Sequence, residues 1–455
     1  MSLLSVPSEL LLLIADFLDA EKDINSLAKA NYYTYSLLNP YLYRRNLLNS
    51  GSSALLWAAL QGSEATAQKC VSERADVNVI DSDGRTPLSC AAVNGHEGVV
   101  RLLLATGRVD ADTKDDFNIT PLSRAAGNGH EGVVRLLLAT GRVDVDVKDG
   151  INITPLSEAA FGGHEGVVSL LIATGRVDID SKDSEGCSPL SRAARNGHEG
   201  VVRLLLATGR VDLDSKDSEG CSPLSRAARN GHEGVVKLLL ATGRVDVDSK
   251  DLQGCSPLSR AARNGHEGVV KLLLATGRVG IDSRNSCGRT PLSEAASGEH
   301  EGVVRLLLAT AKADVNSRDS DDNTPLLWAA LYGNEGVVKL LLATGRVDAD
   351  TKDDFNITPL SRAARNGHEG VVRLLLATGK VDVDSRDSCG RTPLLWAARK
   401  GHVGVVKLLL ATGRVDVNLT GSWLTPSPVA TLSGHEALTK LLLATKREGG
   451  PARQL

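Results

Sequence analysis

A proline recurs every 34 residues through most of the chain, and no other feature of the sequence constrains the fold as strongly. It follows Thr or Ser, precedes Leu, and occupies Pro87, Pro121, Pro155, Pro189, Pro223, Pro257, Pro291, Pro325, Pro359 and Pro393. Divergent copies at Ser53-Ala54-Leu55 and Thr425-Pro426-Ser427 flank these ten, so about twelve repeats fill residues 51–445. A period of this length indicates one supersecondary element stacked many times into a solenoid.

Each repeat predicts two helices joined by a tight turn. In the repeat that begins at Ser188, serine caps the first turn of a helix and the next residue, Pro189, fits the first helical position. Asn196-Gly197 ends this helix, because glycine accepts the left-handed conformation that follows a helix end. The segment HEGVVRLLLAT predicts the second helix, which stops at Gly209.

A projecting turn follows the second helix, and its key position lies three residues before the next proline. Only Gly, Asn and Asp occur there, at Gly84, Asn118, Asn152, Gly186, Gly220, Gly254, Gly288, Asp322, Asn356 and Gly390. These residue types tolerate a positive φ. The position therefore predicts a β-hairpin-like turn in every repeat.

The helix–turn–helix with a projecting turn, opened by Thr-Pro-Leu and carrying Gly-His between the helices, resembles the ankyrin repeat. The resemblance implies an all-α solenoid whose first helices and turn tips form a concave surface for a protein partner. Two departures are visible. Serine, or leucine at Leu56, Leu327 and Leu395, replaces the family's usual histidine after Thr-Pro-Leu. The linker GRVDVDSKD is one residue longer than the family's common form, so we expect a slightly altered turn base and an intact stack.

The histidines and cysteines argue against an enzyme. All ten histidines begin the second helix of a repeat: His96, His130, His164, His198, His232, His266, His300, His368, His402 and His435. A catalytic histidine would be singular and would have a distinct base or nucleophile beside it, so we expect a structural role. None of the seven cysteines makes a CxxC pair, which argues against zinc. Cys187, Cys221 and Cys255 recur at the repeat period, and stacked repeats lie about 10 Å apart, too far for a disulfide. We expect no metal, no cofactor and no catalysis, and we interpret the aspartates of the VDVD linkers as solvated turn residues.

Charge and hydropathy exclude further classes. The 52 Lys and Arg against 55 Asp and Glu leave a net charge of −3, which disfavours nucleic-acid binding. No apolar run approaches the roughly 18 residues that cross a bilayer, and the segment Leu10–Leu18 lacks the flanks of a secretory signal. We expect a soluble monomer of a reducing compartment, the cytoplasm or the nucleus, with a disordered tail at 446–455.

Residues 1–50 do not follow the repeat and predict a separate group of helices. The order Val6-Pro7-x-Glu9-Leu10…Ile14…Phe17-Leu18, Asp23-Ile24…Leu27-Ala28 and Asn39-Pro40-x-Leu42-Tyr43-Arg44 resembles an F-box. Val6 departs from the family's usual leucine, and Asn31-Tyr32-Tyr33 from its usual cysteine- or tryptophan-containing stretch. The resemblance implies docking on the Skp-family adaptor of a cullin–RING ubiquitin ligase through Pro7, Glu9, Leu10, Ile14, Leu18 and Leu27. Alternatively, these residues form a hydrophobic cap that covers the end of the solenoid.

Differences between repeats predict the partner-binding surface, because constant positions build the core. The positions three and six residues after the proline vary, and they lie on one helix face. They carry a basic ladder, Arg192, Arg195, Arg226, Arg229, Arg260 and Arg263, which either binds an acidic partner or is neutralised by the turn acids Asp183, Glu185, Asp217, Glu219 and Asp251. A second, aromatic patch consists of Trp328, Leu331, Tyr332, the turn-tip Phe355 and Trp396, and it either anchors a partner or packs between helices. We favour the aromatic patch, because nothing in the sequence covers its tryptophans.

The sequence thus predicts a protein–protein interaction module. We expect the substrate-recruiting subunit of an SCF-type ubiquitin ligase, with the F-box on the adaptor and the repeats on an unknown target. The alternative is a non-catalytic ankyrin scaffold without a ubiquitin role.

Overall fold

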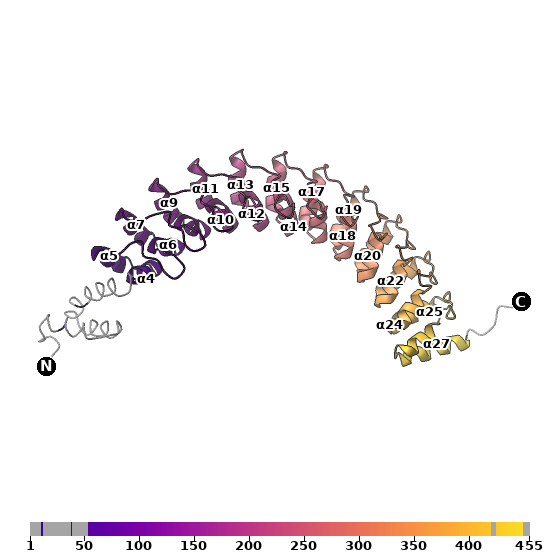
Figure 1. The fold of residues 1–455 in the computed structure, drawn as a ribbon. Coiled ribbons are helices and arrows are strands. Elements are labelled where there is room, and N and C mark those ends of the chain that lie inside the picture. Colours follow the sequence, from indigo (N-terminus) through magenta and orange to yellow (C-terminus); the bar gives the residue numbers. More distant parts are fainter. Residues whose placement is uncertain (1–10, 12–37, 39–52, 420–424, 449–455) are drawn as a thin grey trace. The chain divides into compact units, whose positions relative to one another are not determined.

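The computed structural model describes Leu11, Leu38, residues 53–419 and residues 425–448 (Figure 1). This part of the chain contains helices α4–α27 and no strand, so the predicted all-α repeat solenoid is confirmed. No helix among these residues is long and apolar enough to cross a membrane. The chain divides into two compact units, Met1–Ser218 (unit 1) and Glu219–Leu455 (unit 2), which are described separately.

The helices come in pairs, one pair to a repeat. The first helices of unit 1 are α4 (Ser53–Gln61), α6 (Pro87–Val93), α8 (Pro121–Gly127), α10 (Pro155–Gly162) and α12 (Pro189–Asn196). Its second helices are α5 (Glu64–Ser72), α7 (Glu97–Ala105), α9 (Glu131–Ala139), α11 (Glu165–Ala173) and α13 (Glu199–Ala207).

Unit 2 repeats the same pattern. Its first helices are α14 (Pro223–Asn230), α16 (Pro257–Arg263), α18 (Pro291–Ser297), α20 (Pro325–Tyr332), α22 (Pro359–Asn366), α24 (Pro393–Lys400) and α26 (Pro426–Leu432). Its second helices are α15 (Glu233–Ala241), α17 (Glu267–Ala275), α19 (Glu301–Ala309), α21 (Glu335–Ala343), α23 (Glu369–Ala377), α25 (Val403–Ala411) and α27 (Glu436–Glu448).

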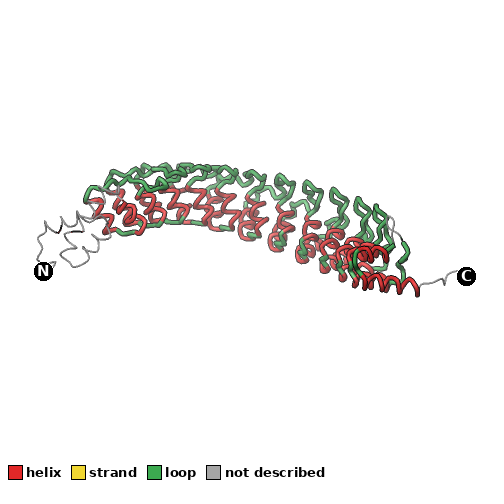
Figure 2. The backbone as a smooth tube through the Cα atoms, turned by 60° about the horizontal axis from the view of Figure 1, so that its bottom comes forward, coloured by secondary structure: helices red, strands yellow, loops and turns green. Residues whose placement is uncertain are grey.

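Within each unit the helices stack in two rows, and the linkers and turns lie along one side of them (Figure 2). In unit 1, α8 packs between α6 and α10, while α9 packs between α7 and α11. The core between the rows consists of the same positions in each repeat, such as Leu190, Ala193, Val202 and Leu205, all fully buried. Each repeat therefore buries its apolar face mainly on its neighbours.

The predicted helix signals are confirmed. Ser188 Oγ accepts a hydrogen bond from the Ser191 N–H at 3.2 Å, and Pro189 occupies the first helical position. Gly197 then closes α12 with φ of 79°. The same cap recurs at the start of the nine other first helices that begin with the proline motif.

The predicted turn conformation is also confirmed. All ten key positions have a positive φ, from 55° at Asn356 to 75° at Gly390. In the turn of the repeat at Pro189, the Gly186 N–H donates to the Asp183 carbonyl at 2.9 Å. The turn tips of neighbouring repeats are joined as well, since the Ser184 N–H donates to the Ile151 carbonyl at 3.0 Å. These bonds make a hairpin-like row without forming a strand in the described residues.

The histidines have the structural role that their regular placement predicts. His130 Nε2 lies 3.0 Å from the carbonyl oxygen of Val93 in the preceding repeat, and since a carbonyl only accepts, Nε2 carries the proton. The same ring faces Gly95, where a Cβ would come within 2.5 Å of Nδ1. Asn334 replaces histidine in one repeat and donates to the Ala296 carbonyl at 2.8 Å. The Gly-His pair is therefore a contact between repeats.

The linker aspartates also join successive repeats. Asp144 Oδ1 accepts from the Asp146 N–H at 3.0 Å, which closes a local turn. Asp146 Oδ2 accepts from the Asp178 N–H of the next repeat at 2.6 Å. Asp144 is exposed, as expected of a solvated turn residue, but Asp146 is only half-exposed, so the prediction of solvation is wrong for the second aspartate of the pair.

The carboxylate of Asp146 makes this contact with one of its two oxygens only. Burial raises the pKa of its carboxyl, and Oδ1 is buried without a hydrogen-bond partner. Asn316 stands at the equivalent position in unit 2, where its Oδ1 accepts from the Asp348 N–H and its Nδ2 donates to the Arg346 carbonyl, both at 3.0 Å. At this position both polar atoms of the asparagine amide have hydrogen-bond partners, whereas only one oxygen of the Asp146 carboxylate has one.

We therefore expect Asp146→Asn to stabilise the neighbouring repeats by about 1 kcal/mol at neutral pH, because it gains a hydrogen bond to a carbonyl and relieves a buried unpaired oxygen. The folded pKa of Asp146 lies above its unfolded value of roughly 3.9, so the cost of its carboxylate is present at neutral pH and disappears as the pH falls. The advantage of the variant should shrink toward about pH 4. Hydrogen exchange of the α9 and α11 amides at the two pH values measures it.

Asp144→Asn is the matched control, because it removes the same charge two residues away while its amide oxygen can still accept the local bond. It should leave the exchange rates nearly unchanged. A destabilised Asp146→Asn protein, or an advantage that grows toward acid pH, would contradict this account of the linker.

Candidate protein-binding surface

The first helices and the turns before them share a repeated ion pair. This pair joins the residue three positions after the proline to the aspartate six positions before the same proline. In unit 1, Arg124 Nη2 lies 2.6 Å from Asp115 Oδ2, and Arg192 Nε lies 2.8 Å from Asp183 Oδ2. In unit 2, Arg260 bonds to Asp251 and Arg362 to Asp353 in the same way. In each unit separately, we call the surface formed by these first-helix positions and the turn tips the first-helix face.

The basic ladder is largely neutralised by these and related pairs. In unit 2, Arg226 and Arg260 are each 5% exposed, and Arg226 Nη2 lies 3.1 Å from Glu219. Arg229 contacts the same glutamate at 3.3 Å. Arg263 donates through two nitrogens to the fully buried Glu294, at 2.9 and 2.7 Å.

The two ladder arginines of unit 1 differ from each other. Arg192 is half-buried on Asp183, whereas Arg195 is exposed on α12. The turn acids Asp183, Glu219 and Asp251 therefore neutralise the ladder as the alternative interpretation proposed. Its role in binding an acidic partner stays a prediction.

The tryptophans of the aromatic patch are covered, so the expectation that nothing covers them is wrong. Trp328 is 8% and Trp396 is 5% exposed. Each replaces arginine in the repeated pair, because its indole N–H donates to the turn aspartate, Asp319 at 2.9 Å and Asp387 at 3.0 Å. A guanidinium also covers each ring.

The covering arginines were missed from the sequence, although a signal existed. Arg289 lies 3.6 Å above the centre of the Trp328 ring, and Arg391 lies 4.1 Å above that of Trp396. Both arginines directly precede a Thr-Pro-Leu motif, and so does Arg85. Arg85 pairs with Asp81 at 2.9 Å.

The two other aromatic side chains of the aromatic patch are exposed. Tyr332 is 55% exposed and stacks on Trp328 with ring centres 6.1 Å apart. Phe355 is 62% exposed at a turn tip. These two side chains, rather than the tryptophans, are the accessible aromatic surface in this part of unit 2.

Further apolar side chains at turn tips and first helices escaped the sequence analysis. In unit 1, Phe117 and Ile151 occupy neighbouring turn tips and are mostly exposed, and Phe161 on α10 is half-exposed. In unit 2, Leu252 at a turn tip is 77% exposed. A comparison of tip residues between repeats would have found them, because most other tips carry polar side chains.

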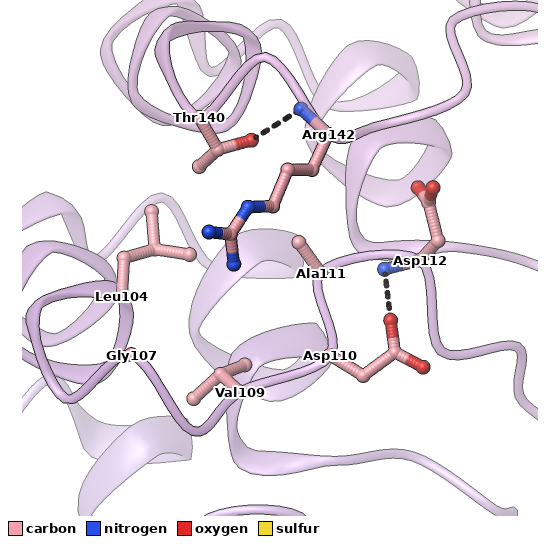
Figure 3. A pocket seen from close by; sticks show the side chains of 8 residues that line it. All are labelled: Leu104, Gly107, Val109, Asp110, Ala111, Asp112, Thr140 and Arg142. Carbon is pink, nitrogen blue, oxygen red and sulfur yellow. Dashed lines mark hydrogen bonds between the residues drawn. The ribbon is translucent and has the colours of Figure 1, made fainter.

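A cavity of about 410 Å³ lies at the linkers that follow α7 and α9 in unit 1. It is lined by Leu104, Gly107, Val109, Asp110, Ala111, Asp112, Thr140 and Arg142 (Figure 3). Ala111 stands where the next two repeats have Val145 and Ile179, so a missing side chain opens the space. No group of three or more His, Cys, Asp or Glu side chains in the described ranges is arranged to hold a metal ion.

The predicted adaptor-binding residues Pro7, Glu9, Leu10, Ile14, Leu18 and Leu27 lie outside the described residues. Two other leucines of that region, Leu11 and Leu38, are described, and both are fully buried.

Comparisons with known proteins agree with the repeat. The family model for ankyrin repeats (three copies) matches residues 27–115, 55–149, 94–183, 122–217, 156–251, 208–283, 258–353, 326–421 and 360–450. Ankyrin repeat domain-containing protein 49 from Bos taurus is 46% identical over 67 residues, which are 14% of this chain and 28% of that protein. Its Mus musculus counterpart is 44% identical over 64 residues, 14% and 27% of the two chains. The chain thus spans less than a third of the length of these relatives.

The indole bonds predict that the tryptophans act on stability. Trp328→Phe keeps most of the ring but removes the donor to the buried Asp319, so we expect a local loss of about 1–3 kcal/mol. Hydrogen exchange of the α20 amides measures this loss. Tyr332→Phe, which changes an exposed ring on the same helix, should stay within about 0.5 kcal/mol of the wild type. Equal exchange rates in the two variants would mean that the indole bond is not stabilising.

Proposed function

The chain belongs to the ankyrin-repeat family, and from this premise we propose that it recruits a target protein to a cullin–RING ubiquitin ligase. Ankyrin repeats form a protein–protein interaction module, and proteins of this family are generally non-catalytic scaffolds. In our proposal the first-helix face holds the target, while residues 1–50 dock on the Skp-family adaptor. The protein itself catalyses no reaction.

The observation that carries target binding is the set of exposed aromatic rings on a rigid frame. Phe117 and Phe161 in unit 1, and Tyr332 and Phe355 in unit 2, present apolar area on the first-helix face. Caps, turn bonds and histidine bonds fix the backbone beneath them, so little order must be gained on binding. Aromatic anchors of this kind commonly carry most of the energy of an interface.

The order of residues 6–44 supports the adaptor half of the proposal. Its leucines and isoleucines exceed what a fifty-residue module can bury alone, so part of that surface must contact the repeats or another protein. The competing function is a scaffold in which this region is a cap for the repeats. The two functions differ in one observable property, which is binding to the adaptor.

We place the activity in the cytoplasm or the nucleus. Cys187, Cys221 and Cys255 recur at the repeat period, and stacked helices lie about 10 Å apart, beyond the reach of a disulfide. Burial raises the pKa of Cys70 and Cys90 to about 11, so these thiols stay protonated. Such cysteines suit a reducing compartment.

The test is co-expression with a Skp-family adaptor. We expect a stable complex that survives size-exclusion chromatography and that Leu10→Asp/Ile14→Asp disrupts, because charges replace apolar docking groups. Leu252→Asp, the same change at an exposed turn tip in unit 2, is the control and should bind fully. Circular dichroism must show the helices intact in both variants.

If the wild type fails to bind the adaptor, or the double variant binds as tightly as the wild type, the ubiquitin-ligase role is wrong. The first-helix face would then serve a scaffold without that role.

A further inference from the structure

Two repeats of unit 1 that begin with the proline motif lack the arginine of the repeated ion pair. In the repeat at Pro87, Cys90 replaces it and Arg85 pairs with the turn aspartate Asp81 instead. In the repeat at Pro155, Glu158 occupies the position three residues after the proline, where the two neighbouring repeats have Arg124 and Arg192. The turn of this repeat still carries an aspartate, Asp149. Asp149 Oδ1 accepts two backbone N–H groups, from Ile151 and Ile153. No side chain in the described part of the chain donates to Asp149 or Glu158. Two carboxylates therefore stand where other repeats have a carboxylate and a cation.

A second repeat, in unit 2, shows how the same substitution is compensated. Glu294 occupies the position of Glu158, but its turn residue is Asn285, whose amide donates to Glu294 at 2.8 Å. Arg263 of the preceding repeat supplies two further bonds. At Glu158 both compensations are missing, because Asp149 replaces the asparagine and Gly127 replaces the arginine.

The nearest arginines of unit 1 bond to other carboxylates, although the Nε of Arg124 is buried without a hydrogen-bond partner. Arg124 bonds to Asp115, and Arg192 bonds to Asp183 through two nitrogens. Burial raises the pKa of Glu158; attraction to Arg192 lowers this pKa, and the smaller repulsion from Asp149 raises it, while Arg124 also lowers it. The acid pair thus lacks a cation of its own.

Three exposed apolar side chains belong to the helix and turn of this pair and to the adjacent turn. Phe161 lies one helical turn after Glu158, is 49% exposed, and has the Arg192 guanidinium 5.6 Å from its ring centre. Phe117 and Ile151 stand at the tips of adjacent turns, which the bond from the Gly150 N–H to the Phe117 carbonyl holds together at 3.0 Å. The acid pair and the three apolar groups form one patch, which we call the Glu158 patch.

We propose that the Glu158 patch binds an arginine of a partner protein, with an apolar residue next to that arginine seated on Phe117, Ile151 and Phe161. The proposal rests on the protein-binding function above and names the chemistry of the bound segment. The guanidinium takes the place that Arg124 and Arg192 occupy on their own aspartates. Arginine is favoured over lysine, because its planar fork can bond to two carboxylates at once.

The deciding variant is Glu158→Arg, which supplies the missing cation from within the chain. It restores the pair of the neighbouring repeats, so it should fold and exchange its α10 amides at least as slowly as the wild type. Glu185→Arg is the matched control, because it makes the same change of charge at the exposed tip of the next turn and leaves Asp149 and Glu158 in place.

The probe is a displayed library of random twelve-residue peptides, selected on the full chain. We expect selected peptides to contain an arginine beside an apolar residue, and to lose at least about tenfold in affinity on Glu158→Arg, the lower end of what removal of one partner of a charge pair costs. Binding to Glu185→Arg should change less than threefold. Replacing the peptide arginine by lysine should weaken binding, and replacing it by glutamine should abolish it.

Three results would overturn the proposal. These are faster α10 exchange in Glu158→Arg, selected peptides without arginine, and a selection that yields no peptide sensitive to Glu158→Arg. Peptides that bind elsewhere on the first-helix face would leave the protein-binding function intact while removing the Glu158 patch from it. Adaptor binding is measured separately and is independent of every one of these outcomes.

Discussion

The structure depends on the burial of each repeat against its neighbours. A pair of helices of eight or nine residues cannot bury Leu190, Val202 and Leu205 within itself, so these side chains are removed from water only by stacking. Polar contacts fix the register of the stack: the histidine ring on the preceding carbonyl, the linker carboxylate on the following N–H, and the bond between turn tips. Because all three recur at the repeat period, each repeat is held in the same way.

The sequence predicts the caps, the turn conformation and the role of the histidines well, because each is local or recurs many times, but it does not predict the linker carboxylate as a contact between repeats. The ten turn positions required a positive φ and carried the residue types that allow it. The Ser188 and Thr86 caps, the proline at the first helical position and the structural histidines follow from the same logic. In each case the comparison of many repeats within one chain shows which residue types a position accepts.

The surface was predicted less well, because its contacts join positions that no local pattern connects. Trp328 was expected to be accessible, yet its indole reaches an aspartate nine residues earlier, and an arginine from the preceding repeat covers its ring. A helix position that varies between repeats can therefore be a buried partner of the turn rather than a free surface. The rings of Phe117 and Phe161 stay 63% and 49% exposed, although the Arg192 guanidinium lies 5.6 Å from the centre of the Phe161 ring, and only the structure separates them from the buried tryptophans.

Nearly identical repeats also imply where recognition must reside. A surface that repeats without change offers every partner several equivalent registers, so it cannot fix one of them. Discrimination must come from positions that break the period. In unit 1 the ion pairs of Arg124 and Arg192 satisfy their own repeats and leave little for a ligand. The interruption at Glu158 leaves charge unmet beside exposed apolar groups, and an unmet charge favours one chemical complement and rejects its opposite. In a stack this regular, the defect in the internal pairing is therefore the feature that can specify a partner.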